Sequence, residues 1–137
     1  MNDPADIVRD YLLTVTNLTA LTGTRIWAEL NYPPAGYKPS VGGAIVFRGD
    51  GVGYQAENAI LRTRWQFKVY GADVYHIRTV YGALMDAMHD TRGLGNILSS
   101  QPQGPAAMLE DEGTNWPFKL EFIETAIRSG LITYAPA

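Results

Sequence analysis

The segment Leu61–Val69 constrains the fold more than any other part of the chain, because its side chains alternate between two kinds. The odd positions carry mostly apolar side chains, which are Leu61, Thr63, Trp65, Phe67 and Val69. The even positions carry polar and basic side chains, which are Arg62, Arg64, Gln66 and Lys68. Successive side chains of a β-strand point to opposite faces of a sheet. The segment therefore predicts a strand with one core face and one basic face.

Two other segments have the apolar spacing of amphipathic helices. The first begins with the capping sequence Asp3-Pro4 and has a stripe made of Ile7, Val8, Tyr11, Leu12 and Val15. The second follows Asp73, a good N-cap, and has a stripe made of Ile77, Val80, Tyr81, Leu84, Met85 and Met88. This spacing is typical of helices that bury one face. We expect the second helix to end near His89 or Asp90, and a short extra turn after the first helix to end at Gly23.

Shorter segments predict the remaining strands. They are Arg25–Leu30, Ala44–Phe47, Ala106–Leu109, Trp116–Thr125 and a last short strand or docking tail at Leu131–Tyr134. In Trp116–Thr125 the side chains of Trp116, Phe118, Leu120 and Phe122 share one face, and Lys119, Glu121 and Thr125 lie mainly on the other.

Glycine and proline mark the connections between these strands. Asn31–Gly43 predicts a long loop, Gly49–Gly53 predicts a hairpin turn, and Thr91–Pro105 predicts an exposed connection. The order of helix, strands, helix and strands indicates an α+β fold. We expect residues 1–137 to form a single domain with a mostly antiparallel sheet of about four to five strands packed against two main helices.

The residues that usually carry catalysis or bind metals do not form a recognisable site. The chain has no cysteine, and His76 and His89 are too far apart along one helix to ligate the same metal. The Gly49–Gly53 segment lacks the Gly-Lys-Ser/Thr ending of a phosphate loop, and Glu110–Glu112 does not match the spacing of a calcium loop. We expect no catalytic residue, no metal and no cofactor, and hence a protein that is not an enzyme.

Two charged groups are candidate interface or channel surfaces. Arg62, Arg64 and Lys68 form a basic stripe that contacts nucleic acid, keeps an exposed sheet face soluble, or meets acids on a neighbouring subunit. Glu110, Asp111 and Glu112 are the candidate acids.

Large rings in the predicted loops form a further candidate surface. Tyr32, Tyr37 and Tyr54 either anchor a partner or cover the edge of the core. Long loops of this kind often contact ligands or neighbouring subunits, which favours assembly over catalysis.

The charge and the N-terminus bear on location. A formal net charge of -3 disfavours broad nucleic-acid binding, and the first residues lack the pattern of a signal peptide. Because no apolar run approaches the length of a membrane span, we expect a cytoplasmic protein without a membrane partner.

Three segments carry a resemblance to a known family: Ile7–Leu12, Leu18–Trp27 and Arg64–Asp73, the last leading into the helix that ends near Met88. With the proline-rich loop between them, they resemble the tail terminator, or tail completion, proteins of long-tailed bacteriophages, which are grouped with minor tail and neck proteins. The resemblance extends over nearly the whole chain.

The resemblance implies a virion structural protein that is assembled in the host cytoplasm. It implies a homo-oligomeric ring, commonly of six subunits, that sits on the tail tube protein, ends tube growth and takes part in joining the tail to the head. Its partners would be the tube and the connector or neck proteins, and DNA would pass through the ring without sequence-specific binding. The alternatives are a head-tail connector or neck adaptor and a small nucleic-acid-binding module.

Overall fold

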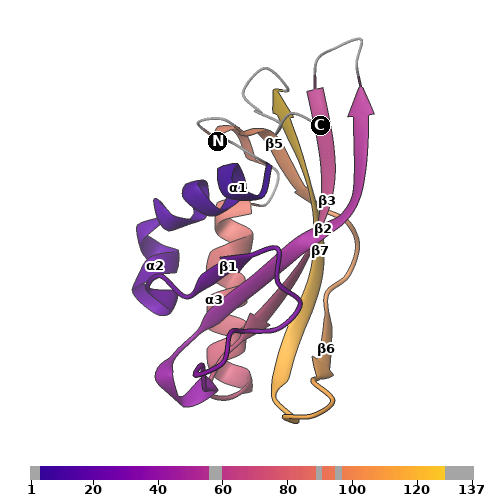
Figure 1. Ribbon diagram of the computed structural model, residues 1–137. Helices are drawn as coiled ribbons and strands as arrows, with labels where there is room; N and C mark the ends of the chain where they lie inside the picture. Colours follow the sequence, from indigo (N-terminus) through magenta and orange to yellow (C-terminus); the bar gives the residue numbers. More distant parts are fainter. Residues whose placement is uncertain (1–3, 56–59, 89–90, 95–96, 129–137) are drawn as a thin grey trace.

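The computed structural model describes residues 4–55, 60–88, 91–94 and 97–128. Within these residues three α-helices lie against one face of a seven-stranded sheet (Figure 1). The helices are α1 (Pro4–Leu13), α2 (Thr16–Thr22) and α3 (Val74–Met88). The strands are β1 (Ile26–Ala28), β2 (Ala44–Gln55), β3 (Ile60–Tyr70), β4 (Thr91–Leu94), β5 (Ile97–Pro102), β6 (Ala107–Glu110) and β7 (Pro117–Arg128), and a 3-10 turn, η1, spans Pro39–Val41.

The sheet is antiparallel except at one edge. Its order is β1-β2-β3-β7-β5-β4, and only the β1–β2 pair is parallel among the described strands. Strands β5 and β6 pair with successive parts of β7, so that Pro102 lies opposite Ile123 and Ala107 lies opposite Leu120. The expected α+β class with a mostly antiparallel sheet is confirmed, and the sheet has more strands than the sequence indicated.

The helices form where the sequence predicts them. Asp73 caps α3, because its Oδ1 accepts a hydrogen bond of 2.9 Å from the backbone N–H of His76. The stripe of α3 is buried at Ile77, Val80, Leu84 and Met88. The predicted extra turn is the separate helix α2, which ends at Gly23 with a φ of 58° that glycine adopts without strain.

The main core lies between the helices and the predicted apolar face of β3. Leu61, Thr63, Trp65, Phe67 and Val69 are all at most 3% exposed, as their alternation predicted. The four apolar residues among them pack with buried residues of α1, α2 and α3 in one cluster. The hydrophobic effect at this layer is the main source of stability for the fold.

A second cluster covers the opposite face of the sheet. Tyr37 from the 31–43 loop packs there against Val46, Tyr70 and Phe118, with Trp116 and Leu120 at its margin. Trp116, Phe118, Leu120 and Phe122 therefore share a face, but it is the face away from the helices. The opposite face of β7 packs under the helices, where Glu121 and Thr125 are buried.

Three local predictions are wrong. The segment Gly49–Gly53 is not a turn but part of β2, whose register against β3 shifts between Gly49 and Val52. The segment Thr91–Pro105 is not simply an exposed connection, because it contains β4 and β5 and buries Ile97. Strand β1 is shorter than expected, because Glu29 adopts a φ of 61° directly after it.

Two further predictions concern residues outside the described ranges. The predicted strand or tail at 131–134 and the histidine at 89 lie outside the described residues.

One carboxylate lies on the helix side of the sheet. Glu121 is 1% exposed, and its Oε2 accepts a hydrogen bond of 3.2 Å from the Tyr81 hydroxyl. Its Oε1 has no hydrogen-bond partner among the described residues, although the Lys119 ammonium lies nearby, 4.3 Å from the centre of the Tyr81 ring. Burial raises the pKa of Glu121, and the hydrogen bond from Tyr81 opposes this effect.

Replacing Glu121 with glutamine is expected to flatten the pH dependence of stability. Because the pKa of Glu121 is higher in the folded state, the unfolded state releases its proton first as pH rises. The wild-type free energy of unfolding should therefore fall relative to that of Glu121→Gln from about pH 4 upwards. Urea denaturation between pH 4 and pH 8 measures this, with the exposed Glu110→Gln as control. If the free energy of unfolding changed with pH in parallel for Glu121→Gln and the wild type, this prediction would be wrong.

Candidate functional site

The predicted basic stripe is only partly an exposed surface. Arg62 Nη1 lies 3.3 Å from Glu124 Oε1 across the β3–β7 pair. This ion pair partly neutralises the charge of Arg62. The Arg64 guanidinium is exposed and stacks over the Phe122 ring, with its Cζ 4.2 Å from the ring centre. Both residues lie on the sheet face away from the helices, next to one another along β3.

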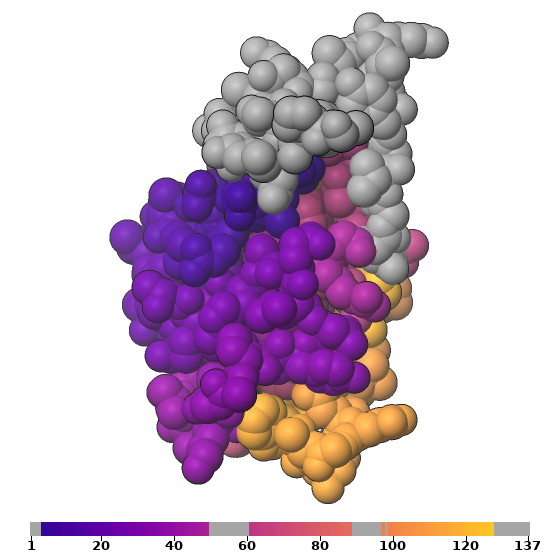
Figure 2. Space-filling view, viewed as in Figure 1, coloured from indigo at the N-terminus to yellow at the C-terminus, as the bar shows by residue number. Residues whose placement is uncertain are grey.

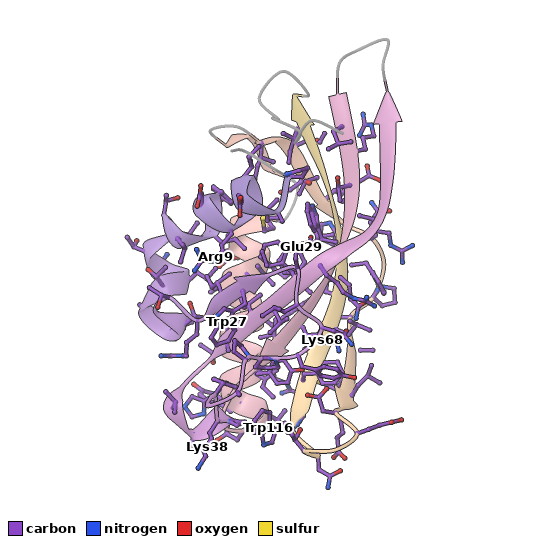
Figure 3. The ribbon with its side chains drawn as sticks, viewed as in Figure 1. Arg9, Trp27, Glu29, Lys38, Lys68 and Trp116 are labelled. Atoms are coloured by element: carbon purple, nitrogen blue, oxygen red, sulfur yellow. The ribbon has the colours of Figure 1, made fainter. Side chains whose placement is uncertain are left out.

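Lys68, the third residue of the stripe, is buried and faces the 31–43 loop. Its Nζ donates hydrogen bonds to Asn31 O at 3.0 Å and to Asn31 Oδ1 at 3.3 Å. It also lies over the rings of Tyr32 and Phe118. Burial lowers the pKa of Lys68, and the carboxylate of Asp111 opposes that effect. The expectation of an exposed Lys68 is corrected, because the returning loop covers this end of the strand (Figure 3).

The three acidic residues after β6 do not act as one group. Glu110 and Glu112 are exposed, whereas Asp111 is 7% exposed. Asp111 Oδ2 accepts a hydrogen bond of 2.9 Å from the Tyr70 hydroxyl, which ties the β6–β7 turn to β3. Burial and Asp111 raise the pKa of Tyr70, so its hydroxyl keeps the proton at neutral pH. Across the described ranges, no three His, Asp or Glu side chains converge as a metal site would require.

Tyr37 is mainly a core residue. Its ring makes edge contacts with Trp27 and Trp116, each with a centroid distance of 5.8 Å. Its hydroxyl donates to Gly42 O at 2.8 Å, and burial raises its pKa to about 12. Tyr32 from the same loop is 57% exposed. Tyr54 does not lie in a loop, because its backbone pairs with Leu61 in the β2–β3 ladder.

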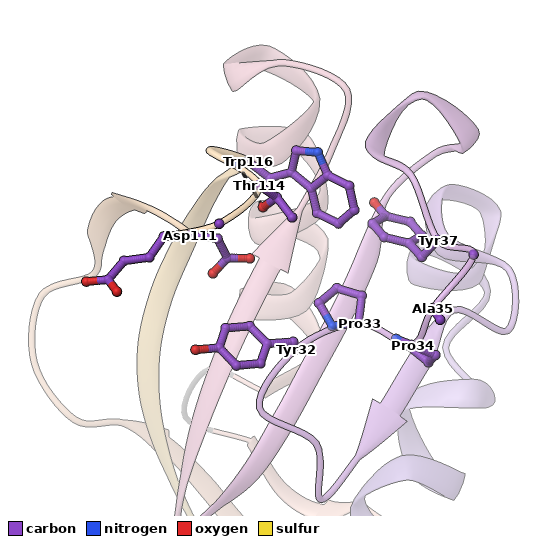
Figure 4. A pocket seen from close by; sticks show the side chains of 11 residues that line it. Tyr32, Pro33, Pro34, Ala35, Tyr37, Asp111, Thr114 and Trp116 are labelled. Atoms are coloured by element: carbon purple, nitrogen blue, oxygen red, sulfur yellow. Dashed lines mark hydrogen bonds between the residues drawn. The ribbon is translucent and has the colours of Figure 1, made fainter.

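A pocket of about 410 Å³ opens where the 31–43 loop meets the β6–β7 turn. The rings of Tyr32, Tyr37 and Trp116 line it together with Pro33, Pro34 and Asp111 (Figure 4). In Figure 4 the Asp111 carboxylate points toward the space between the rings of Tyr32 and Trp116. Figure 2 shows the purple and orange surfaces of these two parts of the chain meeting at the lower end of the molecule.

Sequence reasoning named Tyr37 and Asp111 but did not bring them together. They are separated by more than half of the chain, and only the pairing of β6 with β7 and the return of the loop place them on one pocket. The density of aromatic and proline residues in 32–37 is the signal that points to the loop side of this site.

The histidine that the structure describes lies outside this pocket. His76 is exposed at the start of α3, and its Nδ1 lies 2.8 Å from Asp73 Oδ1. This contact accompanies a helix cap and involves no nucleophile. None of the described helices has the length and apolarity needed to cross a bilayer.

The edge strands of the sheet differ in how far other parts of the chain cover them. At β1 the Arg9 guanidinium donates from Nε to Ile26 O at 2.7 Å, and α1 packs alongside. Strand β6 pairs only with β7 in the described part of the chain, and all four of its residues are exposed. Met108 and Leu109 are 41% and 44% exposed there. Such an edge offers backbone groups and apolar side chains to another protein.

No protein-family model and no curated protein matches the chain. Among solved structures, the chain is similar to one chain of a structure described as the virion of a native gene transfer agent particle. The two chains are 15% identical, with a TM-score of 0.64, and the alignment covers 88% of this chain and 90% of that chain. At this identity the similarity establishes a shared fold.

Proposed function

We propose that this chain is a virion structural protein that forms a ring at the end of a phage tail tube, ends tube assembly and takes part in joining the tail to the head. The observation that carries the proposal is the fold shared with a chain of a gene transfer agent virion. The alignment covers most of both chains, so the likeness concerns the whole fold rather than a common substructure. The sequence resemblance to tail terminator proteins points in the same direction.

The surface of the molecule suits an assembly role. A closed ring requires a heterologous interface, in which one patch of each subunit meets a different patch of its neighbour. The open edge of β6 with Met108 and Leu109 is one such patch, and the arginine-bearing face of the sheet is another. Under this proposal the protein acts through these interfaces and performs no catalytic step.

Two other functions remain as alternatives. A head-tail connector or neck adaptor would use the same fold against a different partner. A nucleic-acid-binding module would need a continuous basic surface, whereas Arg62 is paired with Glu124 and Lys68 is buried. The structure therefore favours a protein partner over direct nucleic-acid recognition.

The test of the proposed function is to assemble tail-tube protein from the virus that carries this gene, with and without the purified chain. We expect rings in negative-stain electron microscopy, bound at tube ends, and tubes that stop growing. A chain that binds portal-side connector rings and ignores tube ends would identify the neck adaptor instead. Binding to neither would contradict the virion function.

A further inference from the structure

The pocket between the 31–43 loop and the β6–β7 turn has the chemistry of a site for a flat cation. Its carboxylate, Asp111, is more than nine-tenths buried. The Tyr70 hydroxyl donates a hydrogen bond of 2.9 Å to Asp111 Oδ2, and none of the described residues donates a hydrogen bond to Asp111 Oδ1. The rings of Tyr37 and Trp116 line the same pocket, and the face of an aromatic ring is negatively polarised. The Tyr32 ring also lines the pocket, and the Lys68 ammonium lies 4.7 Å from its centre. A cation that stacks on such rings and donates to a carboxylate satisfies both features.

Charged side chains of both signs lie in or near the pocket. Asp111 and Glu112 line it, and the buried ammonium of Lys68 lies nearby with its donors directed to Asn31. The Arg48 guanidinium also lies near this ammonium, because its positive charge contributes to the lowered pKa of Lys68. A guanidinium fits better than a second ammonium, because it is planar, weakly hydrated and able to stack while it donates a hydrogen bond.

The same chain presents two exposed arginines that do not line the pocket. Arg48 and Arg64 are both exposed and lie on the sheet face away from the helices. Arg48 lies next to the end covered by the loop, where its Nη2 donates to Gln66 Oε1 at 3.5 Å and its charge acts on Lys68. Arg64 lies farther along β3. One chain thus carries both a cation-accepting pocket and exposed guanidinium groups.

We propose that this pocket binds the guanidinium of Arg48 or Arg64 from a neighbouring copy of the same chain. This inference rests on the proposed ring function, and it specifies one contact of the interface between ring subunits. It joins two different patches, which is the kind of contact that a ring requires.

The first experiment tests the chemistry of the pocket on the full chain. N-acetyl-arginine amide and its uncharged analogue N-acetyl-citrulline amide are titrated separately and followed by NMR. We expect the Trp116 indole N–H to shift with the arginine compound, with an affinity about tenfold higher than for the citrulline compound. Asp111→Asn should remove this preference, whereas the exposed Glu110→Gln, which loses the same charge outside the pocket, should keep it. Equal responses to both compounds would overturn the proposal.

The second experiment tests the source of the arginine. Sedimentation equilibrium up to millimolar protein measures self-association of the wild type, the Arg48→Gln/Arg64→Gln double variant and Asp111→Asn. We expect about tenfold weaker association in each variant and no further loss when all three changes are combined. Arg78→Gln, which removes an exposed arginine of α3, is the matched control. A monomeric wild type, or variants that associate like the wild type, would overturn the pairing.

Folding controls and the tube assay separate the remaining outcomes. Thermal melts check that Asp111→Asn stays folded, and Glu112→Gln provides a second pocket variant with an exposed side chain. If Asp111→Asn still forms rings on tube ends as the wild type does, the pocket inference fails while the proposed function stands. If the arginine pairing is found but tube ends are never bound, the proposed function fails while the pocket inference stands.

Discussion

Replacing Trp65 with alanine is expected to lower the free energy of unfolding by about 3–5 kcal/mol. The Trp65 side chain is 2% exposed at the centre of the main core, with its ring 5.5 Å from that of Phe47 in an edge contact. Its Nε1 donates a hydrogen bond of 2.8 Å to Thr125 Oγ1, which links β3 to β7 inside the core. The truncation creates a large cavity and leaves the Thr125 hydroxyl without this donor.

Urea denaturation followed by circular dichroism measures the loss at Trp65. Because domains of this size are stable by only about 5–15 kcal/mol, the variant is expected to be close to unfolding at 37 °C. Tyr75→Ala is the matched control, since Tyr75 is a large aromatic residue that is 74% exposed and should change stability by less than about 0.5 kcal/mol. A similar small effect at both positions would show that the core is not organised around Trp65.

Replacing Tyr70 with phenylalanine is expected to cost about 1.5–3 kcal/mol. The change removes only the hydroxyl that donates to Asp111 Oδ2, and both side chains are buried. The Asp111 carboxylate then remains in a partly dry site without its donor, which is more costly than losing both partners together. We also expect the pocket to lose its preference for the arginine compound, because the carboxylate is no longer held in place.

Chemical denaturation of three variants distinguishes this account from a general packing effect. Tyr75→Phe removes an exposed hydroxyl and should be neutral. The Tyr70→Phe/Asp111→Asn double variant should be less destabilised than the sum of the two single variants, because the pair forms one interaction. Additive effects would mean that the hydrogen bond between Tyr70 and Asp111 contributes little.

The most accurate sequence predictions concerned elements whose signal is local. The alternation of Leu61–Val69 predicted which face of β3 is buried, and the stripe after Asp73 predicted α3 and its cap. In both cases the side-chain period follows from the backbone geometry of a single element. Tertiary contacts then needed only to cover a face that was already apolar.

The errors arose where a local signal competed with pairing across the sheet. Glycines at Gly49–Gly53 indicated a turn, but the ladder with β3 continues past them with a shift in register. Serine, glutamine and proline in Thr91–Pro105 indicated a loop, yet β5 pairs there with β7 and buries Ser100, whose hydroxyl donates to Met88 O at 2.6 Å. A strand that is covered by neighbours need not be apolar along its length.

The candidate site shows the same difference between features that adjacent residues determine and features that depend on tertiary contacts. Sequence by itself determined that this chain is an α+β protein with a basic strand face, an acidic turn and an aromatic, proline-rich loop, because each of these is a property of adjacent residues. Only the tertiary structure decided that Lys68 is buried, that Arg62 is paired, and that Tyr37 and Asp111 meet in one pocket. The reason is physical: burial and pocket shape depend on which distant segments pack together, and the local side-chain period carries no information about those partners.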